Sequence, residues 1–199
     1  GVHLVDTDGK GVTRIDETGA WVGDTHYELD CLIYASGFEV GTDYARRSGY
    51  DPIGRDGVTL SEYWADGMRT LHGMHVQGFP NLFVVGFTQA GNLISNIPHN
   101  LAEAAKSIAA IVAHAEDVGA QVVKVTPQAE SAWIERLESG GRRFAGDPTC
   151  TPGYYNNEGQ DGGRRALLNS LGFPEGPVAY FEYIEDWRSS GDFDGLEFR

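Results

Sequence analysis

Two runs of continuously apolar residues, each ending at a glycine, constrain the fold of this chain most strongly. The first runs from Cys31 to Ala35 and stops before Gly37, and the second runs from Leu82 to Val85 and stops at Gly86. Strands that are apolar at every position are typical of a sheet covered on both faces. A long helical pattern follows the second run, so the sequence predicts an α/β fold with a parallel sheet.

Three helices are expected after the second run. The first spans about Pro98 to Val118, because apolar residues recur there at helical spacing and Gly119 can end it. Thr126 is expected to cap a second helix that ends at Gly140, and a third spans roughly Val178 to Ser189. Residues 122–125 between the first two helices are short and β-prone.

The first 30 residues predict a small antiparallel β meander. Short β-prone pieces, residues 3–5 and 12–15, flank the turn signal Asp8-Gly9, and a similar pair flanks Gly23-Asp24. The chain therefore combines an N-terminal meander with a helical carboxyl-terminal region.

Composition narrows the partners and the compartment. The 15 Lys and Arg residues against 29 Asp and Glu residues give a net charge of −14, which repels nucleic acid and anionic lipid. No apolar run approaches the roughly 20 residues of a membrane helix, and no signal stretch opens the sequence. Cys31 lies in an apolar run and is expected to be a small buried hydrophobe, so we expect a reducing, cytoplasmic location.

Common catalytic and metal motifs are absent from the sequence. There is no G-x-G-x-x-G turn, no Walker A lysine motif and no G-x-S-x-G elbow. His72 and His75 are three residues apart, but no cysteine or carboxylate stands at ligand spacing, and Gly73 disfavours a helix between them. We therefore interpret them as two partly exposed loop histidines and expect no metal site.

The two glycines that end the apolar runs allow two interpretations. Gly37 and Gly86 either make simple turns or let the backbone approach a ligand beyond the carboxyl ends of parallel strands, and the pair favours a cofactor edge. The segment between Thr88 and Asn100 is rich in amides and leads into the first helix. Asn96 either caps this helix or lies near an electron-rich group at its N-terminus.

Aromatic residues divide into two groups. Trp64, Trp133 and Trp187 fall at apolar helical positions and are expected in the core. Tyr154 and Tyr155 are adjacent in a long Gly- and Asn-rich loop, where both cannot easily be buried. One of these tyrosines is therefore a candidate to face a ligand.

Four ordered segments resemble the flavin-dependent Baeyer–Villiger monooxygenases. Residues 30–38 resemble the family's D-x-x-I-x-A-T-G-F, with Ser36 in place of Thr. Residues 60–67 resemble L-x-x-x-W-x-x-G, and residues 78–83 match G-F-P-N-L-F. Phe87 stands where the family has Pro after Gly, and residues 150–159 are similar to one branch of these enzymes.

The resemblance implies that the chain is the carboxyl-terminal part of a two-dinucleotide FAD/NAD(P)-binding flavoprotein fold. Residues 1–29 would be the trailing β part of the NADPH-binding domain, and residues 30–199 the carboxyl-terminal part of the FAD-binding domain. The Gly-rich turns and the catalytic arginine of the family lie upstream of this region. The resemblance therefore implies that no catalytic residue lies in this chain and that the isolated chain is inactive.

The resemblance also implies a reaction and a set of site residues. The parent enzyme would use FAD and NADPH to insert one oxygen atom from O2 into a ketone, giving an ester or lactone. Gly37, Gly86, Phe87 and Asn96 would lie beside FAD, and the residues that would line the substrate are Thr149, Cys150, Tyr154 and Tyr155.

Two alternatives to ketone oxidation remain. The parent could be a flavin monooxygenase that oxidises sulfides or amines, or the chain could be a non-catalytic, partner-binding module derived from a flavin domain. In an isolated chain, the two apolar runs would lack neighbouring strands. We therefore expect the isolated chain to expose apolar surface and to self-associate.

Overall fold

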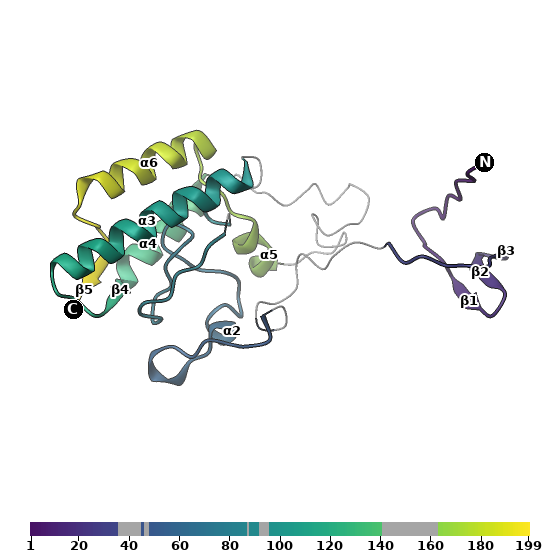
Figure 1. Ribbon diagram of the computed structural model, residues 1–199, viewed down its shortest axis with the longest axis horizontal. Coiled ribbons are helices and arrows are strands. Elements are labelled where there is room, and N and C mark those ends of the chain that lie inside the picture. The colour runs from purple at the N-terminus through teal and green to yellow at the C-terminus, as the bar shows by residue number, and fades with distance from the viewer. Residues whose placement is uncertain (36–44, 46–47, 87, 92–95, 141–162) are drawn as a thin grey trace.

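The structure is a computed structural model that describes residues 1–35, 45, 48–86, 88–91, 96–140 and 163–199. Its elements are β1 (Arg14–Asp16), β2 (Gly19–Val22), β3 (Thr25–Glu28), η1 (Arg55–Gly57), α2 (Leu60–Tyr63), α3 (Ile97–Asp117), β4 (Val123–Val125), α4 (Pro127–Ser139), α5 (Gly163–Ser170), α6 (Pro177–Ser190) and β5 (Leu196–Phe198). The β1–β3 meander and the helical body each form a packed unit of their own (Figure 1).

The N-terminal meander is confirmed, but one of its strands differs from the one that the sequence predicts. Strand β2 pairs antiparallel with both β1 and β3, and the turn at Gly23-Asp24 joins β2 to β3 as predicted. The hairpin expected around Asp8-Gly9 is wrong, because residues 3–5 form no strand and are mostly exposed. The partner of β1 is β2, which follows it after the two residues Glu17 and Thr18.

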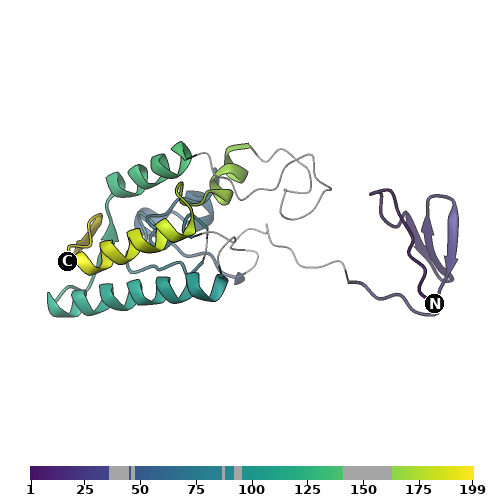
Figure 2. The ribbon, with the colours of Figure 1, turned by 90° about the horizontal axis from the view of Figure 1, so that it is seen from above.

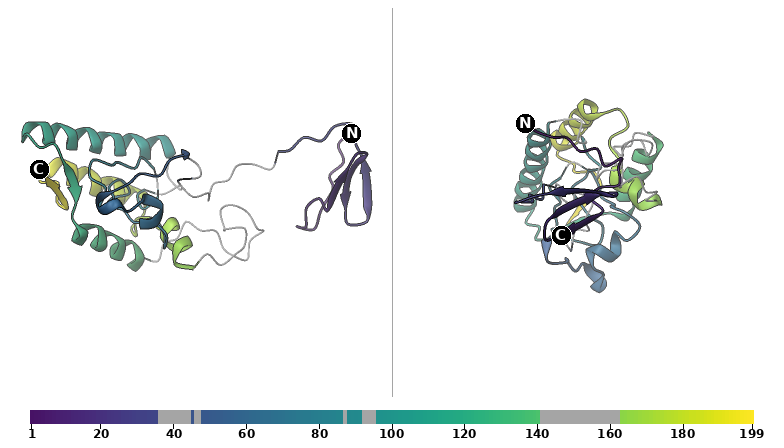
Figure 3. Two further views of the ribbon diagram at one scale, coloured as in Figure 1. Left: turned by 90° about the horizontal axis from the view of Figure 1, so that it is seen from below. Right: turned by 90° about the vertical axis from the view of Figure 1, so that its right-hand side faces the viewer.

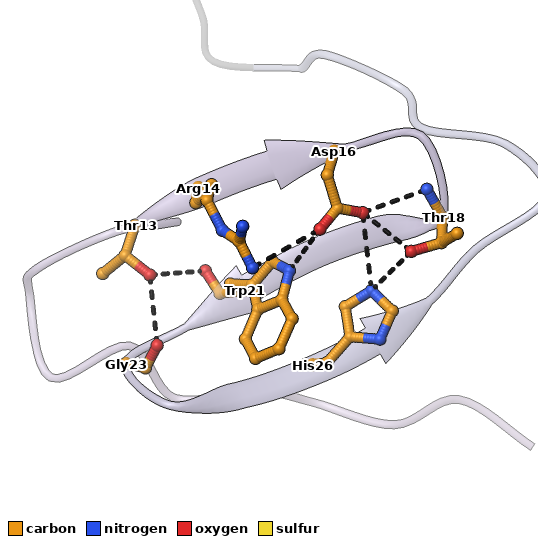
Figure 4. Close-up of polar contacts among 7 residues, drawn as sticks. All are labelled: Thr13, Arg14, Asp16, Thr18, Trp21, Gly23 and His26. Carbon is orange, nitrogen blue, oxygen red and sulfur yellow. Dashed lines mark hydrogen bonds and ion pairs between the residues drawn. The ribbon is translucent and has the colours of Figure 1, made fainter.

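A polar cluster on one face of the meander takes the place of a hydrophobic core (Figure 4). Asp16 accepts hydrogen bonds from the Trp21 indole at 2.6 Å and the Thr18 hydroxyl at 2.8 Å, and these bonds hold the pKa of Asp16 below its usual range. The Arg14 guanidinium lies 4.4 Å from the centre of the Trp21 ring, and the His26 ring lies 4.6 Å from it. Three strands of three or four residues bury little apolar area, so such side-chain pairs are what stabilise this sheet.

The helical body is built around α3, α4 and α6. Helices α3 and α6 lie side by side, while α3 and α4 flank the body on opposite sides with the coil of residues 67–86 between them (Figures 2 and 3). The core that they enclose includes Ile111, Trp133, Leu137, Ile184 and Trp187, each less than a tenth exposed. Two of the three tryptophans expected in the core are thus fully buried.

The predicted helices are confirmed together with their caps. Asn96 caps α3 by accepting a hydrogen bond from the backbone N–H of His99 at 3.2 Å, and Thr126 caps α4 by accepting from Ala129 at 3.3 Å. Pro98 and Pro127 occupy the first turns, where their missing N–H groups cost nothing. Trp64, the third tryptophan expected in the core, is half-buried against the smaller cluster of Leu60, Val76 and Phe79.

The β-prone segment after α3 is also confirmed, as β4, and it pairs antiparallel with β5 near the carboxyl terminus. Asn81 holds the other edge of β4 like a short additional strand. Its side chain donates to the Gln121 carbonyl at 3.0 Å and accepts from the Val123 N–H at 2.8 Å, and its own N–H donates to the Val123 carbonyl at 2.9 Å. The G-F-P-N-L-F segment therefore has a structural role, in which its asparagine fixes β4.

The two apolar runs do not form the predicted parallel sheet among the described residues, whose two sheets are both antiparallel. Residues 31–35 are outside any strand and exposed, with Ile33 81% and Tyr34 76% accessible, and Cys31 is exposed rather than buried. In residues 82–85 only Phe83 makes a bridge, to His75, and Val85 is 54% exposed. A continuously apolar strand needs neighbours on both edges and cover on both faces, and no described segment supplies them.

His72 and His75 are buried, which corrects the prediction that they are partly exposed. The His72 ring lies edge-on to Trp133 and to Trp187, with 4.7 Å between ring centres in each case. Burial lowers the pKa of His75 to about 4 and lowers that of His72 well below its ordinary value. Both side chains therefore act as neutral aromatic rings in the core, and the described residues contain no group of three potential metal ligands.

We predict that the body loses stability in acid through these histidines. The folded pKa of His75 lies below the unfolded value, so its contribution is complete above about pH 6.5 and is lost as the pH falls towards 4. The loss from His75 alone should be about 3 kcal/mol in the free energy of unfolding. Urea unfolding at several pH values, followed by tryptophan fluorescence, measures this slope.

His75→Leu is the informative variant for this prediction, and His3→Gln, which changes an exposed histidine, is its control. Between pH 6.5 and 4, the stability of His75→Leu should fall less steeply than that of the wild type, and His3→Gln should follow the wild type. An unchanged slope in His75→Leu would contradict the prediction.

Candidate cofactor edge

Only two of the predicted site residues lie within the part of the chain that the structure describes. Gly86 ends the segment that bridges to His75, and Asn96 stands at the N-terminus of α3. The other predicted residues lie outside the described residues, namely Gly37, Phe87, Thr149, Cys150, Tyr154 and Tyr155. The edge is therefore built here from Gly86, residues 88–91 and the first turn of α3.

Gly86 faces open space. A Cβ atom added at Gly86 would meet no other atom within 4 Å, and the preceding Val85 is 54% exposed. Its backbone is not in the left-handed region, so conformational freedom does not explain the glycine. An open backbone edge of this kind fits a flat ligand placed against the chain, which is the arrangement that the sequence predicts for FAD.

The N-terminus of α3 lies on the same stretch of chain. Asn96 is exposed, and its side chain caps the helix, which confirms one of the two interpretations offered for it. The other interpretation, a position beside the cofactor, is compatible with the cap, but the first turn offers few backbone donors, because Pro98 has no N–H and the N–H groups of His99 and Asn100 are bonded to Asn96. Helix α3 has 21 residues, so its dipole favours an electron-rich group at this end.

Residues 88–91 are wedged into the body by two glycines at which a side chain would clash. A Cβ atom at Gly73 would lie 2.8 Å from the Thr88 carbonyl oxygen and 2.9 Å from the Ala90 Cβ atom. A Cβ atom at Gly91 would meet the Asn100 side chain of α3 and lie 2.9 Å from the Phe181 ring of α6. These close approaches fix the segment against the 70–73 turn on one side and against two helices on the other.

Gln89 is the central residue of this segment and is fully buried. Its side-chain oxygen accepts from the Thr70 hydroxyl at 2.7 Å, and its side-chain nitrogen donates to the carbonyls of Met68 at 2.6 Å and Leu168 at 3.1 Å. Its backbone N–H donates to the Leu171 carbonyl at 3.0 Å, and its carbonyl accepts from the Trp133 indole at 3.2 Å. One residue thus joins the 68–70 segment, the end of α5 and helix α4.

Sequence reasoning did not single out Gln89. It noted the amide-rich character of the segment between Thr88 and Asn100, but an amide in a loop is usually exposed. The features that distinguish Gln89 are its burial and its φ of 57°, a left-handed backbone that is uncommon outside glycine. Neither feature has a signal in a single sequence.

An ionic cluster, in which Arg188 and Glu103 are mostly buried and Lys106 is exposed, links α6 to α3. The Arg188 guanidinium lies 3.1 Å from the Glu103 carboxylate and donates to the Ser107 hydroxyl at 3.1 Å, and Lys106 lies 2.6 Å from the same carboxylate. Burial raises the pKa of Glu103, but the hydrogen bonds from Lys106 and Arg188 outweigh it and the net pKa is lowered. Glu103 is therefore a charged anchor between the helices rather than an acid–base group.

An open groove of about 480 Å³ lies between α3 and α6, and its lining is mostly acidic: His99, Glu103, Phe181, Glu182, Glu185 and Asp186. Carboxylates repel the phosphates of a dinucleotide, so this groove is a poor place for FAD or NADPH. The edge at Gly86 and the first turn of α3 remains the candidate for cofactor contact. No helix among the described residues is long and apolar enough to cross a membrane.

Relatives cover the whole chain but extend well beyond it. The chain is 44% identical over 203 residues to pentalenolactone D synthase of Streptomyces exfoliatus, covering 100% of this chain and 34% of that protein. It is 46% identical over 191 residues to a Baeyer–Villiger monooxygenase of Streptomyces coelicolor, covering 94% of this chain and 30% of that protein. No family model matches the chain. The chain thus spans about a third of the length of these relatives.

Solved structures give the same result. A polycyclic ketone monooxygenase from the fungus Thermothelomyces thermophila superposes with a TM-score of 0.85 at 34% identity, over 99% of this chain and 32% of that one. OTEMO in complex with FAD and NADP superposes with a TM-score of 0.74 at 24% identity, over 99% of this chain and 35% of that one. The predicted fold, a carboxyl-terminal part of an FAD/NAD(P)-binding flavoprotein, is thereby confirmed.

Two glycine substitutions should separate the wedged part of the segment from its open part. Gly91→Ala forces a Cβ atom into α3 and α6, so we expect a loss of about 1 to 3 kcal/mol in the free energy of unfolding. Gly86→Ala places the same methyl group in open space, and the change should be within about 0.5 kcal/mol. Urea unfolding measures both, and equal losses in the two variants would contradict this account of the edge.

Proposed function

We propose that this chain, which belongs to the flavin-dependent Baeyer–Villiger monooxygenases as a carboxyl-terminal part, completes the FAD-binding domain of an enzyme that converts ketones to esters or lactones. The whole enzyme would use FAD, NADPH and O2. The observation that carries the proposal is homology over 94% of this chain, at 46% identity, to a Baeyer–Villiger monooxygenase.

Three features of the body support the same assignment. The L-x-x-x-W-x-x-G segment has buried Leu60, half-buried Trp64 and a Gly67 at which a Cβ atom would lie 2.7 Å from the Leu168 Cβ atom. The G-F-P-N-L-F segment places Asn81 against β4. The glycine after the second apolar run leaves an open backbone edge, against which a flat cofactor fits.

Within this proposal, residues of the chain bind and orient rather than react. FAD supplies the oxygen-transfer chemistry when it is bound, and the protein contributes placement and exclusion of water. Gly37, Gly86, Phe87 and Asn96 are proposed to lie beside FAD, where the positive end of the α3 dipole favours electron-rich atoms. The residues proposed to line the ketone side are Thr149, Cys150, Tyr154 and Tyr155.

The proposed domain organisation follows from the same homology. Residues 1–29 would be the trailing β part of the NADPH-binding domain, and residues 30–199 the end of the FAD-binding domain. The compact meander, which ends with β3 at Glu28, supports a boundary close to residue 29. The catalytic residues would be supplied by the segment that precedes this chain.

The partners and the location of the protein are proposed from its charge and its exposed apolar residues. A net charge of −14 supports the absence of nucleic-acid partners and a cytoplasmic location is proposed with it. The exposed Ile33 and Tyr34 support self-association of the isolated chain, because an unpaired apolar segment can pair with a second copy. Light scattering on the isolated chain tests this point, and a strict monomer at all concentrations would contradict it.

The proposed reaction predicts a difference between the isolated chain and the complete protein. When this chain is joined to its upstream segment and given FAD, NADPH and a ketone, we expect a product heavier by one oxygen atom. The isolated chain under the same conditions should give none, because the rest of the FAD domain is missing. Mass spectrometry of the extracted products measures both.

The same assay distinguishes the alternatives. A complete protein that oxidises a thioether or an amine but no ketone would support the sulfide- or amine-oxidising alternative and contradict the proposal. A complete protein that binds no FAD would support a non-catalytic module. The names of the relatives favour neither alternative, since they describe Baeyer–Villiger and FAD-binding monooxygenases.

A further inference from the structure

We infer that Gln89 is a positioning residue for the cofactor edge: its buried side chain holds the backbone of residues 88–91, close to Gly86, in the conformation that FAD requires. The inference rests on the proposed function, because it takes the Gly86 edge to be the place where FAD lies. It goes beyond that function by assigning the shape of the edge to one side chain that does not itself contact the cofactor.

The backbone at Gln89 is held in an unfavourable conformation. Its φ of 57° lies in the left-handed region, where a glutamine pays a steric cost that glycine would avoid. A non-glycine residue persists there only when its surroundings over-determine the conformation. Here the surroundings do so through five hydrogen bonds, three from the side chain and two from the backbone.

The Gln89 side chain donates hydrogen bonds to two backbone carbonyls in separate segments. Leu168 lies in the last turn of α5, where carbonyl groups lack intrahelical partners, and the Gln89 amide satisfies one of them. Met68 contributes a second carbonyl to the same amide, and the Met68 N–H donates to the Asn169 side chain of α5 at 2.8 Å. Gln89 therefore ties the edge segment to α5 and to the 68–70 segment at a point with no access to water.

Gln89 also lies between the open and the packed parts of the edge. Gln89 is three residues from the open Gly86 and two from Gly91, which is packed against α3 and α6. Displacement of residue 89 would therefore move the backbone on the cofactor side. Loss of a polar partner in a fully buried site is costly, since the remaining carbonyls and hydroxyl cannot turn to water.

Asn81 provides a matched control for this inference. It is also an amide with a left-handed backbone, at φ of 59°, and its side chain also joins two backbone groups of another segment. Its partners, however, lie in β4 and just before it, at Val123 and Gln121, and its removal should loosen that strand rather than the edge. Asn81→Ala therefore reports the effect of general destabilisation on FAD affinity.

The test uses the complete protein, this chain joined to its upstream segment, with Gln89→Met as the principal variant. Methionine keeps the length of the side chain and removes its three hydrogen bonds. We expect the FAD dissociation constant, measured by recovery of flavin fluorescence on dilution, to rise at least about tenfold. Asn81→Ala should change it less than about twofold, with the urea midpoints of the two variants compared alongside.

Thr70→Val keeps the inference testable if Gln89→Met does not fold, because it removes only the hydroxyl that donates to the Gln89 oxygen and accepts from the Gly73 N–H at 3.1 Å. Thr70→Val should weaken FAD binding more than Asn81→Ala does. Equal FAD affinities in the edge variants and Asn81→Ala would overturn the inference. A wild-type complete protein that fails to bind FAD would instead overturn the proposed function, so the two failures are distinct.

Discussion

Within the described part of the chain, the helical body depends on one buried amide, because Gln89 connects segments that no sheet there connects. Its five hydrogen bonds reach the 68–70 segment, the end of α5 and the indole of Trp133. In most α/β proteins a central sheet aligns the helices through backbone ladders. Among the described residues of this body the only ladder is the short β4–β5 pair, so side-chain bonds to backbone groups do that aligning instead.

Side-chain hydrogen bonds and ion pairs also join segments elsewhere in the molecule. Asn81 imitates a strand along β4, and the Asp16–Trp21 bond stabilises a meander that is too small to bury a core. Arg188 and Glu103 fasten α6 to α3 in the interior. Arg188 and Glu103 are about nine-tenths buried, so their pairing satisfies groups that would otherwise be costly to bury.

The sequence predicted those parts of the fold whose signals are local. Helices α3, α4 and α6 follow from apolar spacing and from caps such as Thr126, and these features depend only on neighbours in the sequence. The prediction of a parallel sheet was wrong for the described residues, because residues 31–35 need partner strands that no described segment provides. His72 and His75 were expected to be partly exposed, because a polar side chain in a loop usually is. Their burial results from tertiary contacts with the rings of Trp133 and Trp187.

For the candidate site, the sequence predicts an edge, and the structure adds the contacts that hold its described residues in place. Gly86 and Asn96 were found from a strand-end pattern and a helix start, both of which are visible in a single sequence. Gln89 was not, because burial and a left-handed backbone arise only from tertiary contacts. The six other proposed residues lie outside the described part of the chain, and their roles stay predictions.

The coil of residues 67–86 and 88–91 has a consequence for how such a protein can diverge. Its close contacts at Gly67, Gly73 and Gly91 leave no room for a methyl group, and its register is set residue by residue by bonds to Met68, Thr70 and Gln89. Irregular segments usually accept insertions and deletions more readily than helices do. Here the tolerance is reversed. The exposed faces of α3 and α4 can accept substitutions, whereas an insertion or deletion in the coil would break its close contacts.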